Sequence, residues 1–177
     1  YLHADVLPPS PAGRTHEFDG VGVVWLAELN AGADTPQDST NDGAILLKDE
    51  LEAFDGPVLP RAFIVEEKVL KSNNAADVTA YLFFDNVDDA DRAATVFANL
   101  SKTPDRVVMN HVSDHAPCPN PIYRYKGIVE ASSRNRKDLD AALVAGQLEG
   151  VKPALEVVTR ECLLWDNGPV QQAAKIA

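Results

Sequence analysis

Potential proton carriers are concentrated in one short stretch, His111-Val-Ser-Asp-His-Ala-Pro-Cys118. Imidazole titrates near neutral pH, so His111 and His115, beside the carboxylate of Asp114, could accept and return a proton. In this interpretation a histidine is the base and Asp114 orients it. The alternative needs no chemistry: two solvated loop histidines, with Asp114 as a turn former.

The same stretch also holds residue types that bind zinc, at His111, His115 and Cys118. A His-x3-His pair is a ligand spacing when both residues lie on one helix. Here the end of an expected strand and three prolines between positions 117 and 121 argue against a helix. We therefore expect these side chains to diverge and to hold no metal. The chain has no glycine-rich nucleotide-binding motif either, so we expect no cofactor.

Aromatic residues could supply the rest of a site. Tyr123 and Tyr125 share one face of an expected strand, and their hydroxyls could donate a hydrogen bond to a developing oxyanion, although cross-strand packing is the alternative. Glu28, if buried, would have a raised pKa and could act as a base. The side chains expected to line a substrate-binding face are Trp25, Glu28, Phe63, Tyr81 and Phe83.

One basic cluster, Ser132-Ser-Arg-Asn-Arg-Lys137, precedes an expected helix. Its guanidinium groups and the N–H groups of the helix start could bind a phosphate or a carboxylate. A solvated turn in which Ser133 or Asn135 caps the helix is the alternative.

Charge and hydropathy exclude some partners. The chain has 16 Lys and Arg against 27 Asp and Glu, a net charge of −11, which disfavours binding to nucleic acid or to an anionic membrane surface. No apolar run approaches the ~18–20 residues that a membrane-spanning helix needs. We expect no nucleic-acid partner and no membrane partner.

A length of 177 residues, 45% of them hydrophobic, fits one domain with a sizeable core. We expect an extended arm over residues 1–16, a single domain over 17–166 and a tail over 167–177. Two cysteines, Cys118 and Cys162, are too few for a disulfide scaffold. Residues 1–14 lack the pattern of a signal peptide, which favours a cytoplasmic location, although a signal already removed would leave no trace.

Hydrophobic periodicity predicts three β-α-β units. Residues 154–165 fit a helix as well as a strand, but the run Val157-Val158-Thr159 favours the strand. We expect Asp88 to cap the second helix and strand 61–70 to form a hairpin with strand 78–84. The expected strands are 21–29, 61–70, 78–84, 106–112, 122–131 and 154–165, and the expected helices are 44–54, 88–100 and about 136–150.

This order predicts an α+β fold. Its first two units give the split β-α-β pattern of a ferredoxin-like antiparallel sheet with helices on one face. The other face would be bare and would need cover, so we expect a homodimer. The aromatic side chains expected on that bare face are Trp25, Phe63, Tyr81, Phe83 and Tyr123.

In element order, over roughly residues 21–165, the chain resembles the dimeric α+β barrel superfamily, whose sheets pack face to face around a ligand cavity. The third β-α-β unit is extra to the minimal pattern of that superfamily. Its members include cofactor-free cyclases, lyases and oxygenases, haem enzymes and binding proteins. The resemblance therefore implies a fold and a cavity, but it does not select one activity.

We therefore expect a small cofactor-independent enzyme that acts by proton transfer on an apolar, aromatic or polyketide-like molecule, as a cyclase, dehydratase or lyase. His111 or His115 would be the base, Asp114 its orienting partner, and Tyr123 or Tyr125 the oxyanion donor. The alternative is a non-catalytic small-molecule-binding or protein-interaction module that uses the same sheet face.

Between the two histidines, strand alternation favours His111. It follows Val107 and Met109 on one face of strand 106–112, so we expect its ring in an apolar space as a neutral base. His115 lies beyond the strand and should matter less.

Overall fold

The computed structural model describes residues 2–8, 20–23, 63, 65–72, 77–113 and 124–163 of the chain. By its contacts the chain divides into two compact units. The first unit comprises Tyr1–Trp25, Glu66–His111 and Tyr125–Ala177, and the second comprises Leu26–Val65 and Val112–Arg124. Nearly all the described elements belong to the first unit.

Seven strands and two helices make up the described secondary structure. In chain order they are β1 (Leu2–Val6), β2 (Gly20–Val23), β3 (Val65–Lys71), β4 (Val78–Phe84), α3 (Val87–Asn99), β5 (Arg106–Val112), β6 (Gly127–Ser133), α4 (Arg136–Leu148) and β7 (Leu155–Leu163).

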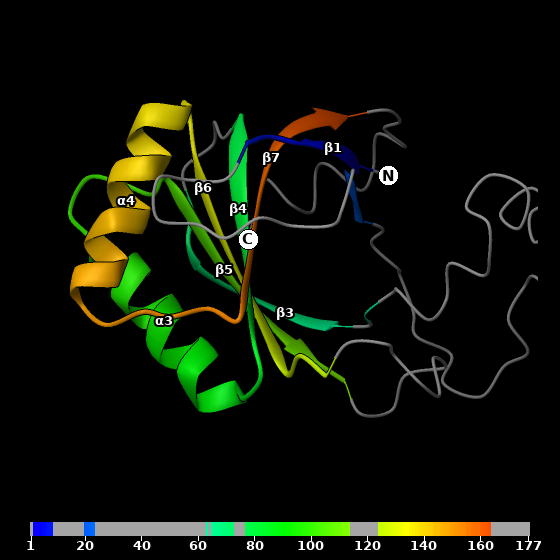
Figure 1. The fold of residues 1–177 in the computed structure, drawn as a ribbon, viewed down its shortest axis with the longest axis vertical. Coiled ribbons are helices and arrows are strands. Elements are labelled where there is room, and N and C mark those ends of the chain that lie inside the picture. Colours follow the sequence, from blue (N-terminus) through cyan, green and yellow to red (C-terminus); the bar gives the residue numbers. More distant parts are fainter. Residues whose placement is uncertain are drawn as a thin grey trace, which may run out of the picture. The chain divides into compact units, whose positions relative to one another are not determined.

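The strands form one sheet in the order β2-β1-β7-β4-β6-β5-β3. Neighbours run antiparallel in the pairs β1–β2, β1–β7, β4–β7, β4–β6 and β5–β6. Helices α3 and α4 pack against each other and lie on the same side of this sheet (Figure 1). The predicted α+β class with an antiparallel sheet is therefore confirmed.

The core lies between the sheet and the two helices. Because side chains alternate along a strand, the even-numbered residues of β4, from Val78 to Phe84, all point toward the helices and are buried. They meet the alanine-rich face of α3, where Phe97 is 1% exposed, and Leu139 and Leu143 of α4. Each large apolar side chain buried here contributes roughly 1.5–3 kcal/mol.

Both helices begin with the same four-residue pattern. Asn86 and Asn135 each accept a hydrogen bond from the backbone N–H three residues later, at 2.8 and 3.0 Å. Each asparagine amide also donates to the aspartate at that position, Asp89 or Asp138. The first of these bonds pairs one of the N–H groups that a helix start leaves without a partner, and the second holds the asparagine side chain in place for it. Asp88, the predicted cap of the second helix, instead lies in its first turn.

Several predicted elements match the structure. Strands 78–84 and 106–112 have their predicted bounds, and residues 155–163 form a strand rather than a helix. The predicted strand 122–131 begins later, at Gly127, so Tyr125 precedes it. Helix 44–54 and residues 24–29 of the first predicted strand lie outside the described residues.

The predicted hairpin between residues 61–70 and 78–84 is wrong. Both neighbours of β4 in the sheet are other strands, β6 and β7, whereas β3 lies at the far end of the order beside β5. The choice of partner depends on contacts between segments far apart in the chain, and local turn signals do not report these contacts. No helix in the described part of the chain is long and apolar enough to cross a bilayer.

Candidate functional site

The candidate site lies on the face of the sheet that points away from α3 and α4, called here the distal face. Its side chains alternate with those of the helix-packed core, and the strand registers place them in rows. One row runs Val157, Tyr81, Glu130, Val108 across four strands, and the next runs Thr159, Thr79, Ser132, Arg106. The third row runs Leu155, Phe83, Ile128, Asn110.

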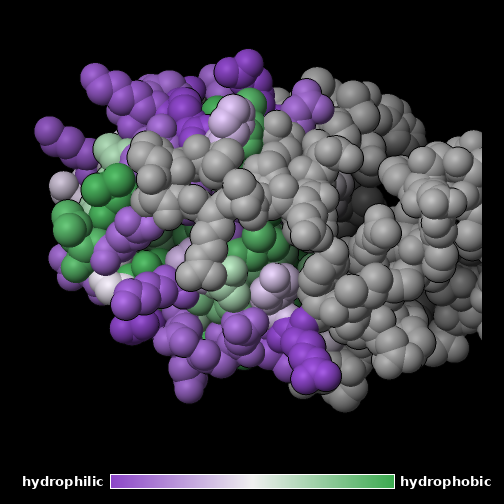
Figure 2. Space-filling view, in the orientation of Figure 1, coloured by the Kyte–Doolittle hydropathy of each residue, from purple (hydrophilic) through white to green (hydrophobic). Residues whose placement is uncertain are grey.

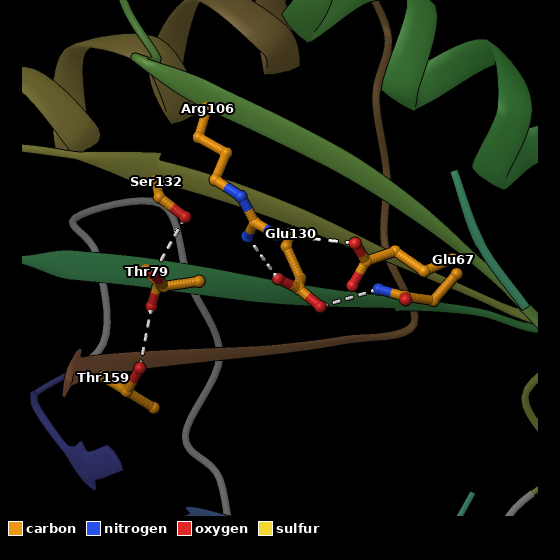
Figure 3. Close-up of polar contacts among 7 residues, drawn as sticks. Glu67, Thr79, Arg106, Glu130, Ser132 and Thr159 are labelled. Atoms are coloured by element: carbon orange, nitrogen blue, oxygen red, sulfur yellow. Dashed lines mark hydrogen bonds and ion pairs between the residues drawn. The ribbon is translucent and has the colours of Figure 1, made fainter. Parts of the chain in front are cut away.

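Glu130 is the centre of a polar cluster on this face. Its Oε1 accepts a hydrogen bond from Asn110 Nδ2 at 2.7 Å, and its Oε2 accepts one from Arg106 Nη1 at 3.0 Å. The Nη2 atom of Arg106 also lies 3.8 Å from Glu67 Oε1, so the guanidinium is shared between two carboxylates (Figure 3).

The strand register explains why these residues meet. Arg106 and Asn110 share one face of β5 and flank Val108, which is directly opposite Glu130 on β6. Each is therefore a diagonal neighbour of Glu130, a separation that long polar side chains can bridge. Glu67 reaches the same guanidinium from β3, the strand beside β5.

Burial dominates the electrostatics of Glu130. The residue is 9% exposed, and loss of hydration raises the pKa of its carboxyl above the ordinary value of 4.5. The positive charge of Arg106 and the hydrogen bonds from Asn110 and Arg106 lower the pKa but do not cancel the effect of burial, while the charge of Glu67 raises it. A carboxyl with this balance can hold or release a proton closer to neutral pH than an exposed glutamate can.

A row of hydroxyl groups borders the cluster. Thr79 Oγ1 donates to Ser132 Oγ at 2.8 Å, and Thr159 Oγ1 donates to the backbone oxygen of Thr79 at 3.2 Å (Figure 3). All three residues are fully buried. These bonds join three adjacent strands and pair polar groups that would be costly to bury alone.

Aromatic and aliphatic side chains surround the polar groups. Tyr81 is directly opposite Glu130, and Phe83 follows on the same face. The ring of Phe83 packs against Tyr125, with centroids 5.1 Å apart and planes tilted by 50°. Tyr81 and Phe83 are only 5% and 9% exposed in the single chain. The expectation that they form a bare face is therefore wrong.

His111 is not part of this group. Val107 and Met109 belong to the core beneath the helices, and His111 continues their face, where its Nε2 lies 3.1 Å from Asp91 Oδ1 on α3. The imidazole side chain is 36% exposed. The predicted alternation of side chains along the strand is therefore correct. The expected apolar environment of the His111 ring is wrong, because β5 ends beside the Asp91 carboxylate of α3.

The other predicted site residues are not among the described residues of the first unit. Phe63 is half-buried, precedes β3 and belongs to the second unit. The following predicted residues lie outside the described residues: Trp25, Glu28, Asp114, His115, Cys118 and Tyr123. Within the described ranges, no three His, Cys, Asp or Glu side chains are grouped as metal ligands would be.

The basic cluster before α4 makes internal contacts. Ser132 turns into the distal face, and Asn135 caps the helix. Arg136 donates through Nε to Asp140 and through Nη1 to the backbone oxygen of Pro8, both at 2.7 Å. The guanidinium of Arg136 therefore ties the N-terminal segment to α4.

Sequence reasoning missed the residues at the centre of the site, Arg106, Asn110 and Glu130. A signal was present: Glu130 is the one charged residue of the β6 sequence Gly127-Ile-Val-Glu-Ala-Ser-Ser133. An ionisable side chain in an otherwise buried strand requires a polar partner, and such groups often mark functional sites. Asn110 is similarly placed among apolar residues of β5.

Comparisons with protein-family models, with curated proteins and with solved structures found no match to this chain.

Proposed function

We propose that the protein is a small cofactor-independent enzyme that transfers protons on an apolar, aromatic or polyketide-like molecule, with Glu130 as its acid–base group. The observation that carries this proposal is a buried carboxyl of raised pKa on a sheet face with Tyr81 and Phe83. A general base of this kind accelerates a reaction by about 10²–10⁴-fold.

The proposed step is a reversible transfer of one proton between a substrate carbon and Glu130. The Glu130 carboxylate takes a proton from a carbon beside a substrate carbonyl; the electron pair of the C–H bond forms a C=C bond, and the π electrons of the carbonyl move to its oxygen. The resulting carboxylic acid then returns the proton to the same or another atom. Asn110 and Arg106 hold the two carboxyl oxygens in a fixed orientation during this exchange.

A second candidate is a non-catalytic binding module that uses the same face. Its support is that both carboxyl oxygens of Glu130 already have partners, Asn110 and Arg106, as in a purely structural ion pair, and that His111 lies on the opposite face beside Asp91. In this second proposal Glu130 would only anchor a polar group of the ligand.

We also propose a ferredoxin-like relationship for the centre of the sheet. Its support is the sequence of elements β4-α3-β5-β6-α4-β7 together with the strand order β7-β4-β6-β5. These are the second and third predicted β-α-β units, not the first two. A common fold of this kind would be compatible with either candidate function.

We also propose that the protein forms a homodimer, through the end strand β3 and not through an aromatic sheet face. On the face that Figure 2 shows, the described residues are mostly polar, with hydrophobic ones between them. Val69 and Leu70 of the end strand β3 are 41% and 38% exposed, which supports a homodimer formed there. Light scattering at micromolar concentration should give twice the chain mass, and a monomer mass would exclude this dimer.

Proton exchange tests the enzyme proposal without a known substrate. A panel of aromatic and cyclic ketones in D₂O is followed by NMR for loss of the protons beside the carbonyl. The wild-type protein should accelerate exchange for at least one class, and Glu130→Gln should reduce that acceleration by about 10²-fold or more. Saturation-transfer NMR on the same panel detects binding independently.

Two matched variants make the result specific. His111→Ala removes the histidine on the helix side and should leave the exchange rate close to that of the wild type. Glu66→Gln removes one exposed carboxylate and should do the same. Binding without any acceleration of exchange would favour the non-catalytic module, and loss of exchange in His111→Ala alone would return the chemistry to histidine.

A further inference from the structure

Glu67 is the one residue of the polar cluster that does not touch Glu130. It comes from the end strand β3, its side chain is 34% exposed, and its Oε1 lies 3.8 Å from Arg106 Nη2. Glu130 occupies a different nitrogen of the same guanidinium, at 3.0 Å. The single positive charge of Arg106 is thus divided between a buried carboxylate and a half-exposed one.

This division has a direct chemical consequence. A guanidinium that serves one buried carboxylate stabilises its charged form strongly and holds it ionised. A second carboxylate on the same guanidinium draws the cation toward itself and adds a negative charge nearby. Because of both effects, the positive charge of Arg106 stabilises the ionised form of Glu130 less than the 3.0 Å contact between them would do alone.

We infer that Glu67 is a positioning residue that acts on Glu130 through Arg106, competing for the guanidinium so that Glu130 can exchange its proton rather than remain a fixed ion-pair partner. The inference rests on the proposed function in so far as that proton is used for catalysis. The competition between Glu67 and Glu130 for Arg106 does not depend on a substrate.

Few other charged groups face Glu130 among the described residues. Arg106 approaches from β5 and Glu67 from β3, and the phenol of Tyr81 lies opposite on β4. Val157 is the β7 member of the same row, and α3 and α4 lie across the sheet. Removal of the Glu67 charge should therefore change the electrostatic environment of Glu130 more than removal of another described carboxylate. This agrees with the Glu67 charge raising the pKa of the Glu130 carboxyl.

The test measures the protonation of Glu130 directly. Infrared difference spectra over a pH series report the carboxylic acid C=O band, which is assigned to Glu130 by its loss in Glu130→Gln. In Glu67→Gln the midpoint of this band should move to lower pH, because Arg106 then serves Glu130 alone. Glu67→Asp, whose shorter side chain withdraws from Arg106 but keeps its charge, should give a smaller shift in the same direction.

Glu66→Gln is the matched control, because it removes the same charge from the adjacent β3 position, which points to the other face of the strand. It should leave the midpoint unchanged. An unmoved or raised midpoint in Glu67→Gln, or an equal shift in Glu66→Gln, would overturn the inference. A shifted midpoint without proton-exchange activity in the wild type would support the role of Glu67 and reject the catalytic proposal, so the two failures are distinguishable.

Discussion

The amide Nδ2 of Asn110 lies 2.7 Å from Oε1 of Glu130, and both residues are buried on adjacent strands of the same sheet. The amide is a neutral donor, so it orients the carboxyl without adding charge. Arg106 holds the other oxygen at 3.0 Å and supplies the positive charge. The carboxyl of Glu130 is thus fixed at both oxygens by chemically different partners.

Asn110→Ala should destabilise the fold. The substitution leaves one oxygen of Glu130 buried without its donor, a loss of about 1–3 kcal/mol. Urea denaturation at neutral pH measures the change in the free energy of unfolding. Asn99→Ala, at an exposed position at the end of α3, provides the control and should change stability little. Equal stability of the Asn110 variant and the wild type would show that the hydrogen bond contributes nothing.

The pH dependence of stability should reflect Glu130. Its pKa in the folded protein is raised above the ordinary value of 4.5 by burial, so between these two values the folded state keeps a proton that the unfolded chain has released. The contribution of Glu130 to stability is fully present below 4.5 and is lost as the pH rises through the folded pKa.

Comparison with Glu130→Gln isolates this contribution, since all other ionisable groups are shared. The stability of the wild type relative to the variant should fall as the pH rises from 4.5, measured by urea denaturation at a series of pH values. A relative stability that stays level above 4.5 and falls as the pH drops below 4.5 would mean that Arg106 outweighs burial and that the pKa is lowered instead.

Gly146→Ala should destabilise the packing of α4 on α3. A Cβ at this position would lie 2.7 Å from Cε1 and Cζ of Phe97, whose ring is packed in the core and only 1% exposed. Overpacking of this kind costs about 1–3 kcal/mol, which offsets the roughly 1 kcal/mol that alanine gains over glycine in a helix. Thermal and urea unfolding should both show the loss.

A double-mutant cycle with Phe97→Leu checks the reason for this loss. The smaller side chain makes room for the new methyl group, so the combined loss should be less than the sum of the single losses. Additive losses would show that the close contact between position 146 and the ring of Phe97 is not the cause.

Local sequence signals predicted the elements whose patterns are unbroken. Strands β4 and β5 consist largely of β-favouring residues between turn signals, and their bounds match the prediction. The run Val157-Val158-Thr159 correctly favoured a strand. Both helices are capped by an asparagine three residues before an aspartate. The cap predicted for α3, Asp88, is wrong, whereas the two residues predicted for α4 included the correct one, Asn135.

Long-range pairing could not be read from the sequence in the same way. Strand β3 was expected beside β4, but it lies beside β5 at the end of the sheet. The alternation that groups His111 with Val107 and Met109 was correct, yet alternation cannot say which face the helices cover. For the same reason Glu130 was overlooked: its partners Arg106 and Asn110 come from another strand, and only the register joins them.

The pH at which the Glu130 carboxyl titrates in the folded wild-type protein tests the central claim most directly. Infrared difference spectroscopy, with Glu130→Gln to assign the carboxylic acid band, measures this midpoint. Burial on the distal face predicts a midpoint above 4.5. A midpoint at or below 4.5, or a carboxylate that stays ionised throughout the accessible range, would make Glu130 a permanently charged partner of Arg106 and contradict its role in proton transfer.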